Sequence, residues 1–256
     1  MQGMHSDRQL REIFHFCFLQ HLLKISAENL YILKGGVNLR FFFHSPRYSE
    51  DMDLDVNAGN ITTLKKNGYK ILADAAFARS LKTYGIESIA INDPAKAKHT
   101  ETTQRFRVRL LTQAGEELPT KIEFSRRNVG NKESSVDMIN PELARQYNRL
   151  AYRCRHYPAH IAVLQKINAL AGRAETQTRD AFDLMILHAG GHTQAAAIDK
   201  LVTRQKRNQA IEKLMALSFR EYEGQVLEYL EADAHSAYGG PQAWASIQET
   251  VMRLLQ

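Results

Sequence analysis

The stretch from Lys34 to Val56 constrains this chain more than any other part of it. An apolar run at 30–33 is followed by Lys34-Gly35-Gly36, and residues 49–56 read Ser-Glu-Asp-Met-Asp-Leu-Asp-Val. A glycine pair between two apolar segments predicts a strand, a tight turn and the start of a helix. The acidic stretch then predicts a second strand. The sequence therefore places a glycine turn shortly before a strand rich in carboxylates.

The acids of this strand occupy alternate positions, at Asp51, Asp53 and Asp55. Successive side chains of a strand point to opposite faces, so the acids share one face and the apolar residues share the other. Neighbouring carboxylates on one face lie roughly 7 Å apart and repel by about 2 kcal/mol at an effective dielectric near 20. A divalent cation bound between the carboxylates turns this repulsion into a net attraction. Sites made only of oxygen ligands suit Mg²⁺ or Mn²⁺. The strand predicts a metal site, with a solvated edge strand as the alternative.

The glycine turn predicts a site for phosphate. Glycine lets the backbone come close to an anion, and free N–H groups at a helix start, together with the positive end of the helix dipole, can hold a triphosphate. A Gly-Gly pair alone is more often an ordinary turn. The acidic strand that follows favours the interpretation of Gly35 and Gly36 as phosphate-binding residues.

Two later segments predict a β-hairpin that shares this polar face. Residues 104–112 and 120–125 alternate polar and apolar side chains and flank a loop at 113–119. If the apolar faces of both strands pack into the core, Glu123 and the arginines at 105, 107 and 109 share the opposite face. Glu123 is then a candidate third acid for metal, and the arginines are candidates for binding phosphate oxygens. The alternative is an amphipathic hairpin whose polar face meets solvent.

The C-terminal half reads as helices. Residues 130–141 are polar and predict a loop, after which helical patterns continue to the C-terminus. Lys166 and Arg173 are seven positions apart, two helical turns, so they project from the same side of their helix. Asp180 and Asp183 follow Thr178, a plausible N-cap, and acids in a first turn are stabilised by the helix dipole. That structural role is the alternative to a chemical one.

These motifs resemble those of the AbiEii/AbiGii nucleotidyltransferase toxins, members of the polymerase-β-like superfamily. The first motif is Gly35-Gly36-(x)2-Leu39-Arg40 followed by residues 47–54, Arg-Tyr-Ser-Glu-Asp-Met-Asp-Leu. Later motifs follow in the same order at residues 164–170, at Arg173 and at residues 179–184. Val37-Asn38 stands where the family more often has Thr-Ala, and Asp55 adds an acid to the usual pair.

The resemblance implies a fold and a set of site residues. The fold is an α/β nucleotidyltransferase-like domain with a mixed sheet at residues 1–140, followed by an all-α helical C-terminal domain at 141–256. The implied catalytic residues are Asp51, Asp53, Glu123, Lys166 and Asp180, of which Asp51, Asp53 and Glu123 would bind metal. The implied nucleotide-binding residues are Lys34, Gly35, Gly36, Arg40, Ser49, Lys166 and Arg173. The roles of Asp55 and Asp183 stay open.

The resemblance also implies an activity and partners. We expect Mg²⁺- or Mn²⁺-dependent transfer of NMP from an NTP to an acceptor, with tRNA as the expected acceptor. The expected role is that of the toxin in a toxin–antitoxin or phage abortive-infection system, with a cognate antitoxin as a candidate partner. Two alternatives remain: transfer of a nucleotidyl or phosphoryl group to a protein or small molecule, and nucleotide binding without catalysis.

Composition narrows the remaining classes. Residues 1–150 carry 22 basic and 17 acidic residues, so most of the net charge of +6 lies in the half with the acidic strand, where a polyanion would approach. The absence of a long apolar run and of a signal-like N-terminus leads us to expect a cytoplasmic protein without a membrane partner. Two isolated cysteines and ten histidines without a metal-ligand spacing argue against a disulfide framework or a zinc site.

Overall fold

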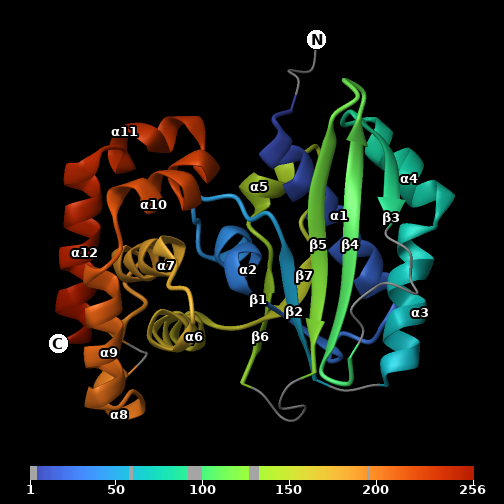
Figure 1. Cartoon of the computed structure of the whole chain (residues 1–256). Helices are drawn as coiled ribbons and strands as arrows, with labels where there is room; N and C mark the ends of the chain where they lie inside the picture. Colours follow the sequence, from blue (N-terminus) through green and yellow to red (C-terminus); the bar gives the residue numbers. More distant parts are fainter. Residues whose placement is uncertain (1–4, 58–59, 92–99, 127–132, 195–196) are drawn as a thin grey trace. The chain divides into compact units, whose positions relative to one another are not determined.

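A computed structural model describes residues 5–57, 60–91, 100–126, 133–194 and 197–256. The chain divides into two compact units (Figure 1). Unit 1 consists of Met1–Phe42 and Tyr48–His156, and unit 2 consists of Phe43–Arg47 and Tyr157–Gln256. The chain therefore passes between the units three times, and the five residues before Tyr48 belong to unit 2.

The compact units change at 156/157, whereas the predicted domains change at 140/141. The difference arises because β6 (Ser135–Met138), α5 (Pro141–Gln146) and β7 (Arg153–His156) belong to unit 1, where β7 pairs with β1. The predicted loop at 130–141 was wrong for β6, and residues 130–132 lie outside the described residues. β6 and β7 have only four residues each, so neither is long enough for its alternation to stand out in the sequence.

Unit 1 is built on a mixed sheet of seven strands in the order β3-β4-β5-β2-β1-β7-β6. Its other elements are α1 (Asp7–Ile25), β1 (Tyr31–Lys34), α2 (Gly35–Phe42), β2 (Met52–Val56), α3 (Ile61–Leu72), α4 (Ala75–Lys82), β3 (Ile86–Ile91), β4 (Thr103–Thr112) and β5 (Glu117–Ser125). β2 lies between β1, its antiparallel neighbour, and β5, its parallel neighbour. The predicted hairpin of β4 and β5 is present, with β5 starting earlier than expected.

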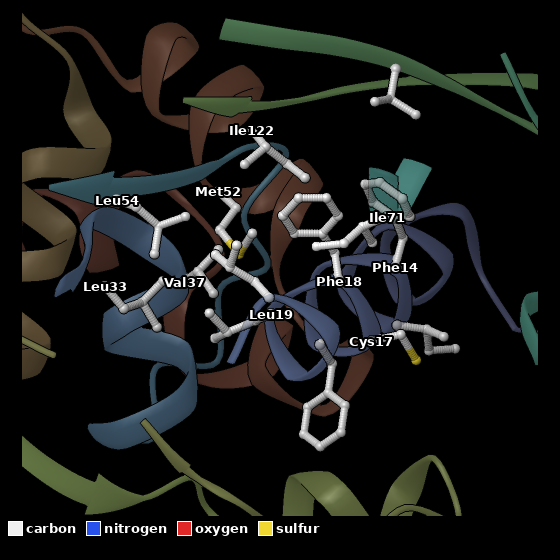
Figure 2. Packing of buried hydrophobic residues seen from close by; sticks show 14 of the residues in the cluster. Phe14, Cys17, Phe18, Leu19, Leu33, Val37, Met52, Leu54, Ile71 and Ile122 are labelled. Atoms are coloured by element: carbon white, nitrogen blue, oxygen red, sulfur yellow. The ribbon is translucent and has the colours of Figure 1, made fainter. Parts of the chain in front are cut away.

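One face of the sheet carries the core of unit 1. Leu33, Met52, Leu54 and Ile122 point from adjacent strands toward buried side chains of α1 such as Phe18, as Figure 2 shows. The helices α1, α2, α3 and α4 all contribute apolar side chains to this cluster. Because strand side chains alternate, burying this set directs the polar set to the other face.

Residues 61–82 form two helices, α3 and α4, with a turn at 73–74 between them. Asp74 accepts a hydrogen bond from the backbone N–H of Phe77 at 2.6 Å and so caps the start of α4. An aspartate is a favourable N-cap because its carboxylate satisfies an N–H that has no partner inside the helix. The turn lets α3 and α4 each pack an apolar stripe against the sheet.

Unit 2 is helical. It contains α6 (Ala159–Gly172), α7 (Thr178–Ala189), α8 (Ile198–Leu201), α9 (Arg204–Met215), α10 (Phe219–Gln225), the 3-10 helices η2 (Leu227–Tyr229) and η3 (Ala232–Ala234), α11 (His235–Tyr238) and α12 (Pro241–Leu255). Its core includes the stacked rings of Tyr222 and Trp244, whose centroids lie 4.8 Å apart. A mixed sheet followed by a helical C-terminal region confirms the predicted fold class. Among the described residues, the structure has no helix with the length and apolar character of a membrane span.

The packing of α3 on β4 generates a stability prediction. A Cβ at Gly68 would lie 2.5 Å from Cζ of Phe106, whose ring is fully buried. We expect Gly68→Ala to destabilise unit 1 by about 1–3 kcal/mol, because the ring cannot move without disturbing the core. Urea unfolding measures this cost. In a Phe106→Leu background the alanine should cost much less, and an equal cost in both backgrounds would contradict the proposed overlap.

Candidate active site

The acidic strand lies at the centre of the sheet with its side chains sorted by face. Met52, Leu54 and Val56 are buried in the core, while Asp53 and Asp55 point to the opposite face. Asp51 directly precedes β2, and its carboxylate reaches β5, where Oδ1 accepts a hydrogen bond from the backbone N–H of Lys121 at 3.1 Å. The structure therefore confirms that the apolar and the acidic side chains of β2 lie on opposite faces of the sheet.

Strand register brings charges from four strands into one line across the sheet. Lys34 is the register partner of Asp53, and Asp53 is the partner of Glu123. Glu123 in turn lies opposite Arg105. Partners in adjacent strands share a face and lie close together, so these four residues form a charged row with two carboxylates in the middle and a cation at each end. The structure thus brings together Asp53 and Glu123, which are 70 positions apart in the sequence.

Side-chain cations neutralise three acids of this face, which are Asp51, Asp55 and Glu123. Lys34 Nζ lies 2.7 Å from Asp55 Oδ1. Lys121 Nζ lies 2.5 Å from Asp51 Oδ2, and Arg105 Nη2 lies 2.6 Å from Glu123 Oε2. These side chains remain partly exposed, so each pair is only modestly stabilising by itself. Their combined effect is to offset the repulsion among the acids.

Asp53 differs from the other acids because its carboxylate forms no ion pair or hydrogen bond with a described residue. Burial raises the pKa of Asp53 above its ordinary value, and the nearby carboxylates of Glu123 and Asp51 raise it further. Lys34 and Lys121 pull the pKa the other way without cancelling the rise. An oxygen that is desolvated and surrounded by acids is a strong position for a cation.

The glycine turn lies close to Asp53. α2 begins at Gly35, directly after β1, and Gly35 has a φ of +70°. A Cβ at this position would lie 3.1 Å from Asp53 Oδ2, so the backbone passes close to the carboxylate. Glycine is suited to both requirements, the left-handed φ and the close approach. A role for Gly35 and Gly36 in binding phosphate stays a prediction.

Arg40 and Ser49 have contacts within unit 1. Arg40 is buried on α2, and its Nε donates to Glu12 Oε2 at 2.6 Å. The guanidinium also lies over the ring of Tyr48, 4.5 Å from its centroid. Ser49 Oγ donates to the backbone oxygen of Asp51 at 2.9 Å and shapes the entry to β2. Both residues therefore have structural contacts near the acids, and their predicted contact with a nucleotide stays a prediction.

Sequence reasoning missed a buried histidine that supports this segment. Thr120 Oγ1 donates to the backbone oxygen of Glu50 at 2.6 Å, so its only proton is used and His15 Nε2 is the donor in the 2.8 Å contact between them. Burial lowers the pKa of His15 to about 4, although Asp51 pulls it upward. His15 is therefore neutral near pH 7 and holds the backbone next to Asp51. The ten histidines of the sequence show no regular spacing, so nothing in the sequence distinguished His15 from the others.

In unit 2, the predicted residues of α6 and α7 form a buried ionic network. Lys166 Nζ lies 3.0 Å from Asp180 Oδ1 and 2.5 Å from Asp183 Oδ2. Arg173 Nε lies 2.8 Å from Asp180 Oδ2, in an orientation that makes an ion pair without a hydrogen bond. Both acids are fully buried, whereas Arg173 is 40% exposed. The structure brings all three predicted residues together.

Arg47 completes this network and was not assigned a role from the sequence, although it stands inside the first motif. Its Nη2 lies 3.1 Å from both oxygens of Asp183. Burial raises the pKa of Asp183, but Arg47 and Lys166 outweigh it and hold that pKa below its ordinary value. Burial likewise lowers the pKa of Lys166, and Asp183 and Asp180 outweigh it and raise that pKa. All three groups are therefore charged at neutral pH.

The donor chemistry of the acidic face fits a hard divalent cation. Asp51, Asp53 and Glu123 offer only carboxylate oxygens, the ligand type that Mg²⁺ and Mn²⁺ prefer. Within the described part of the chain, no group of three or more His, Cys, Asp or Glu side chains is arranged to hold a metal ion. The carboxylates of Asp51 and Glu123 are instead directed toward Lys121 and Arg105, with which they form ion pairs.

Comparison with known proteins supplies the family. Residues 17–255 match the family described as "Nucleotidyl transferase AbiEii toxin, Type IV TA system". Among curated protein sequences none matches this chain.

Solved structures share the fold at low sequence identity. MenT4, a nucleotidyltransferase toxin from Mycobacterium tuberculosis, has a TM-score of 0.63 at 18% identity, covering 97% of this chain and 84% of that one. A putative nucleotidyltransferase from H. pylori has a TM-score of 0.56 at 18% identity, covering 98% and 97%. JHP933 from Helicobacter pylori has a TM-score of 0.53 at 18% identity, covering 99% and 95%. At this identity the likeness supports the fold alone.

The raised pKa of Asp53 predicts a gain in stability on removing its charge. A carboxyl whose pKa is higher in the folded protein than in the unfolded chain loses stability as the pH rises past its ordinary pKa of about 3.9. Asp53→Asn should therefore raise the melting temperature at pH 7, and the difference should vanish below about pH 4. Asp51→Asn is the matched control, because it loses the Lys121 ion pair and should give no such gain. A melting temperature that falls in Asp53→Asn would refute the argument.

The Arg47–Asp183 pair predicts the opposite pH dependence in unit 2. We expect Arg47→Ala to destabilise unit 2 by about 3 kcal/mol or more, since it leaves a buried carboxylate short of one cation. The pKa of Asp183 is depressed, so this stability is present above pH 4 and is lost as the pH falls through the folded-state pKa. Denaturant unfolding at several pH values measures it. Arg253→Ala, which removes an exposed pair with Glu249, should cost no more than about 1 kcal/mol, and equal costs would overturn the prediction.

Proposed function

The chain belongs to the AbiEii nucleotidyltransferase toxin family, and from that premise we propose that it transfers NMP from an NTP to an RNA acceptor, with tRNA as the expected acceptor. The observation that carries the proposal is the charged row, in which Asp53 is partly buried among other acids and forms no ion pair with any residue that the structure describes. A purely structural acid would be expected to have a partner.

The acids have a defined part in this reaction. Divalent cations, when bound, would neutralise the triphosphate and favour attack of an acceptor hydroxyl on the α-phosphorus with loss of pyrophosphate. Asp51, Asp53 and Glu123 would hold them. The partly exposed cations Lys121 and Arg105, once released from their ion pairs, would be available for phosphate oxygens.

The network of unit 2 belongs to the same proposal. We include Lys166 and Asp180 as catalytic residues and Arg173 as a nucleotide-binding residue. Lys166 is buried, charged and held between two acids, so its Nζ is kept in a fixed place. Arg173 is the more exposed cation of the network, which suits contact with a soluble ligand. Lys34, Gly35, Gly36, Arg40 and Ser49 stay candidates for the nucleotide site in unit 1.

The biological part of the proposal is that of a toxin acting in the cytoplasm, opposed by a cognate antitoxin. The matched family is described as a type IV toxin–antitoxin system, and this description supports it. Expression of the wild-type chain should slow growth of a host strain, and co-expression of an antitoxin encoded beside it should restore growth.

Label transfer tests the chemistry. The protein is incubated with total RNA, Mg²⁺ and each NTP carrying label in the α- or the γ-phosphate. We expect α-label on RNA and none from γ-label, and Asp53→Asn should lower the rate about 100-fold or more. Asp233→Asn, which changes an exposed aspartate of unit 2, is the matched control and should leave the rate unchanged.

The other outcomes decide between the alternatives. Label found on protein or on a small molecule would replace the RNA acceptor. Transfer of γ-label would indicate phosphoryl transfer. NTP binding without any transfer would favour the non-catalytic alternative, and transfer by Asp53→Asn at the wild-type rate would remove these acids from the mechanism.

A further inference from the structure

A row of arginines runs along β4 on the same face as the acids. Arg105, Arg107 and Arg109 alternate with side chains that are buried in the core, so all three point to the polar face. Alternate residues of a strand lie roughly 7 Å apart, and the row therefore extends about 14 Å. It starts at Arg105, which lies opposite Glu123 in the charged row, and leads away from the acids.

The middle of this row carries a positive charge that no described residue neutralises. Arg107 is exposed and forms no ion pair in the part of the chain that the structure describes. Its register partner on β5 is Lys121, so two cations face each other across the strands. Like charges at opposed positions destabilise a sheet. Lys121 has Asp51 as its counter-ion, whereas Arg107 has none among the described residues.

The end of the row is partly neutralised. Arg109 Nη1 lies 3.0 Å from Glu117 Oε2, and both side chains are about half exposed. An exposed ion pair of this kind is weak and exchanges readily with another anion. Glu117 therefore competes with any anionic ligand for Arg109, whereas nothing described competes for Arg107.

We infer that the arginine row of β4, with Arg107 as its main contact, binds the phosphate backbone of the RNA acceptor. This inference rests on the proposed function and names the surface that the acceptor uses. Charges repeated along a strand match a ligand whose own charges repeat along a chain, which is a polynucleotide rather than a single nucleotide. The position of Arg105 beside Glu123 would bring one end of the bound RNA toward the acids.

The binding experiment uses the full chain, without NTP and with a chelator to remove divalent ions. Fluorescence anisotropy follows a labelled single-stranded RNA oligonucleotide and, separately, labelled unfractionated tRNA over a series of KCl concentrations. Arg107→Glu should weaken RNA binding about tenfold or more at low salt. Arg107→Ala should lower the slope of log affinity against log salt by about 0.7 for the single strand.

Matched variants separate this surface from general charge effects. Arg79 is exposed on α4, a helix of the apolar face, so Arg79→Glu makes the same charge change away from the row. It should bind RNA nearly as the wild type does. Glu117→Gln removes the carboxylate that competes for Arg109 and should tighten RNA binding by a few fold.

The outcomes separate the inference from the proposed function. Weaker binding by Arg107→Glu together with tighter binding by Glu117→Gln supports the row. Equal binding by Arg107→Glu and Arg79→Glu, or no RNA binding by the wild type, overturns it. If the wild type transfers α-label to RNA and Arg107→Glu does so with an unchanged KM for RNA, only this inference fails. If RNA binds through Arg107 and no label is transferred, only the proposed function fails.

Discussion

Repulsion between carboxylates on neighbouring strands is the interaction on which the arrangement of charged side chains on the polar face of unit 1 depends. Register places Asp53 beside Glu123, and Asp51 and Asp55 lie on the same face. Such a face is stable only if opposite charge is close, and the fold supplies it from β1, β5 and β4 through Lys34, Lys121 and Arg105. The protein therefore supplies counter-ions for Asp55, Asp51 and Glu123, whereas the carboxylate of Asp53 forms no ion pair with any residue that the structure describes.

The sequence predicted those parts of the site that follow from local periodicity. Alternation along β2 and along the hairpin correctly sorted Asp53, Glu123 and the arginines onto one face, because a strand side chain has only two directions available. The parallel pairing of β2 with β5 is a contact between distant segments, and no local pattern encodes it. For the same reason the cation partners of the acids could not be predicted from the sequence. Lys121 and Asp51 are 70 positions apart, and Arg47 and Asp183 are 136 positions apart. The short strands β6 and β7 were missed because four residues are too few for a period to be recognised.

In unit 2 the structure shows structural contacts for the acids of α7, and the catalytic role of Asp180 stays a prediction. Asp180 and Asp183 were expected either to favour the start of a helix or to take part in catalysis. Asp180 lies in the first turn of α7, where the helix dipole favours negative charge, and both acids are fully buried against Lys166. Arg47 and Lys166 hold the pKa of Asp183 below its ordinary value although burial opposes this, and Asp183 and Asp180 raise the pKa of Lys166. Arg47 belongs to this network and stands two positions before Ser49, so the segment that leads into the acidic strand is anchored in the helical unit.

The distribution of charge along β4 bears on which acceptor the site serves. A small-molecule acceptor would need cations only beside the acids, where Arg105 and Lys121 already lie. Arg105 and Arg109 each have a carboxylate partner on β5, so their ion pairs already account for arginine at these two positions. Alternation by itself requires only that the position of Arg107 be polar, and glutamine or threonine would serve equally well. Among the described residues Arg107 has no such partner and lies opposite Lys121, so it is the arginine of the row for which a long anionic ligand offers an explanation that the sheet does not.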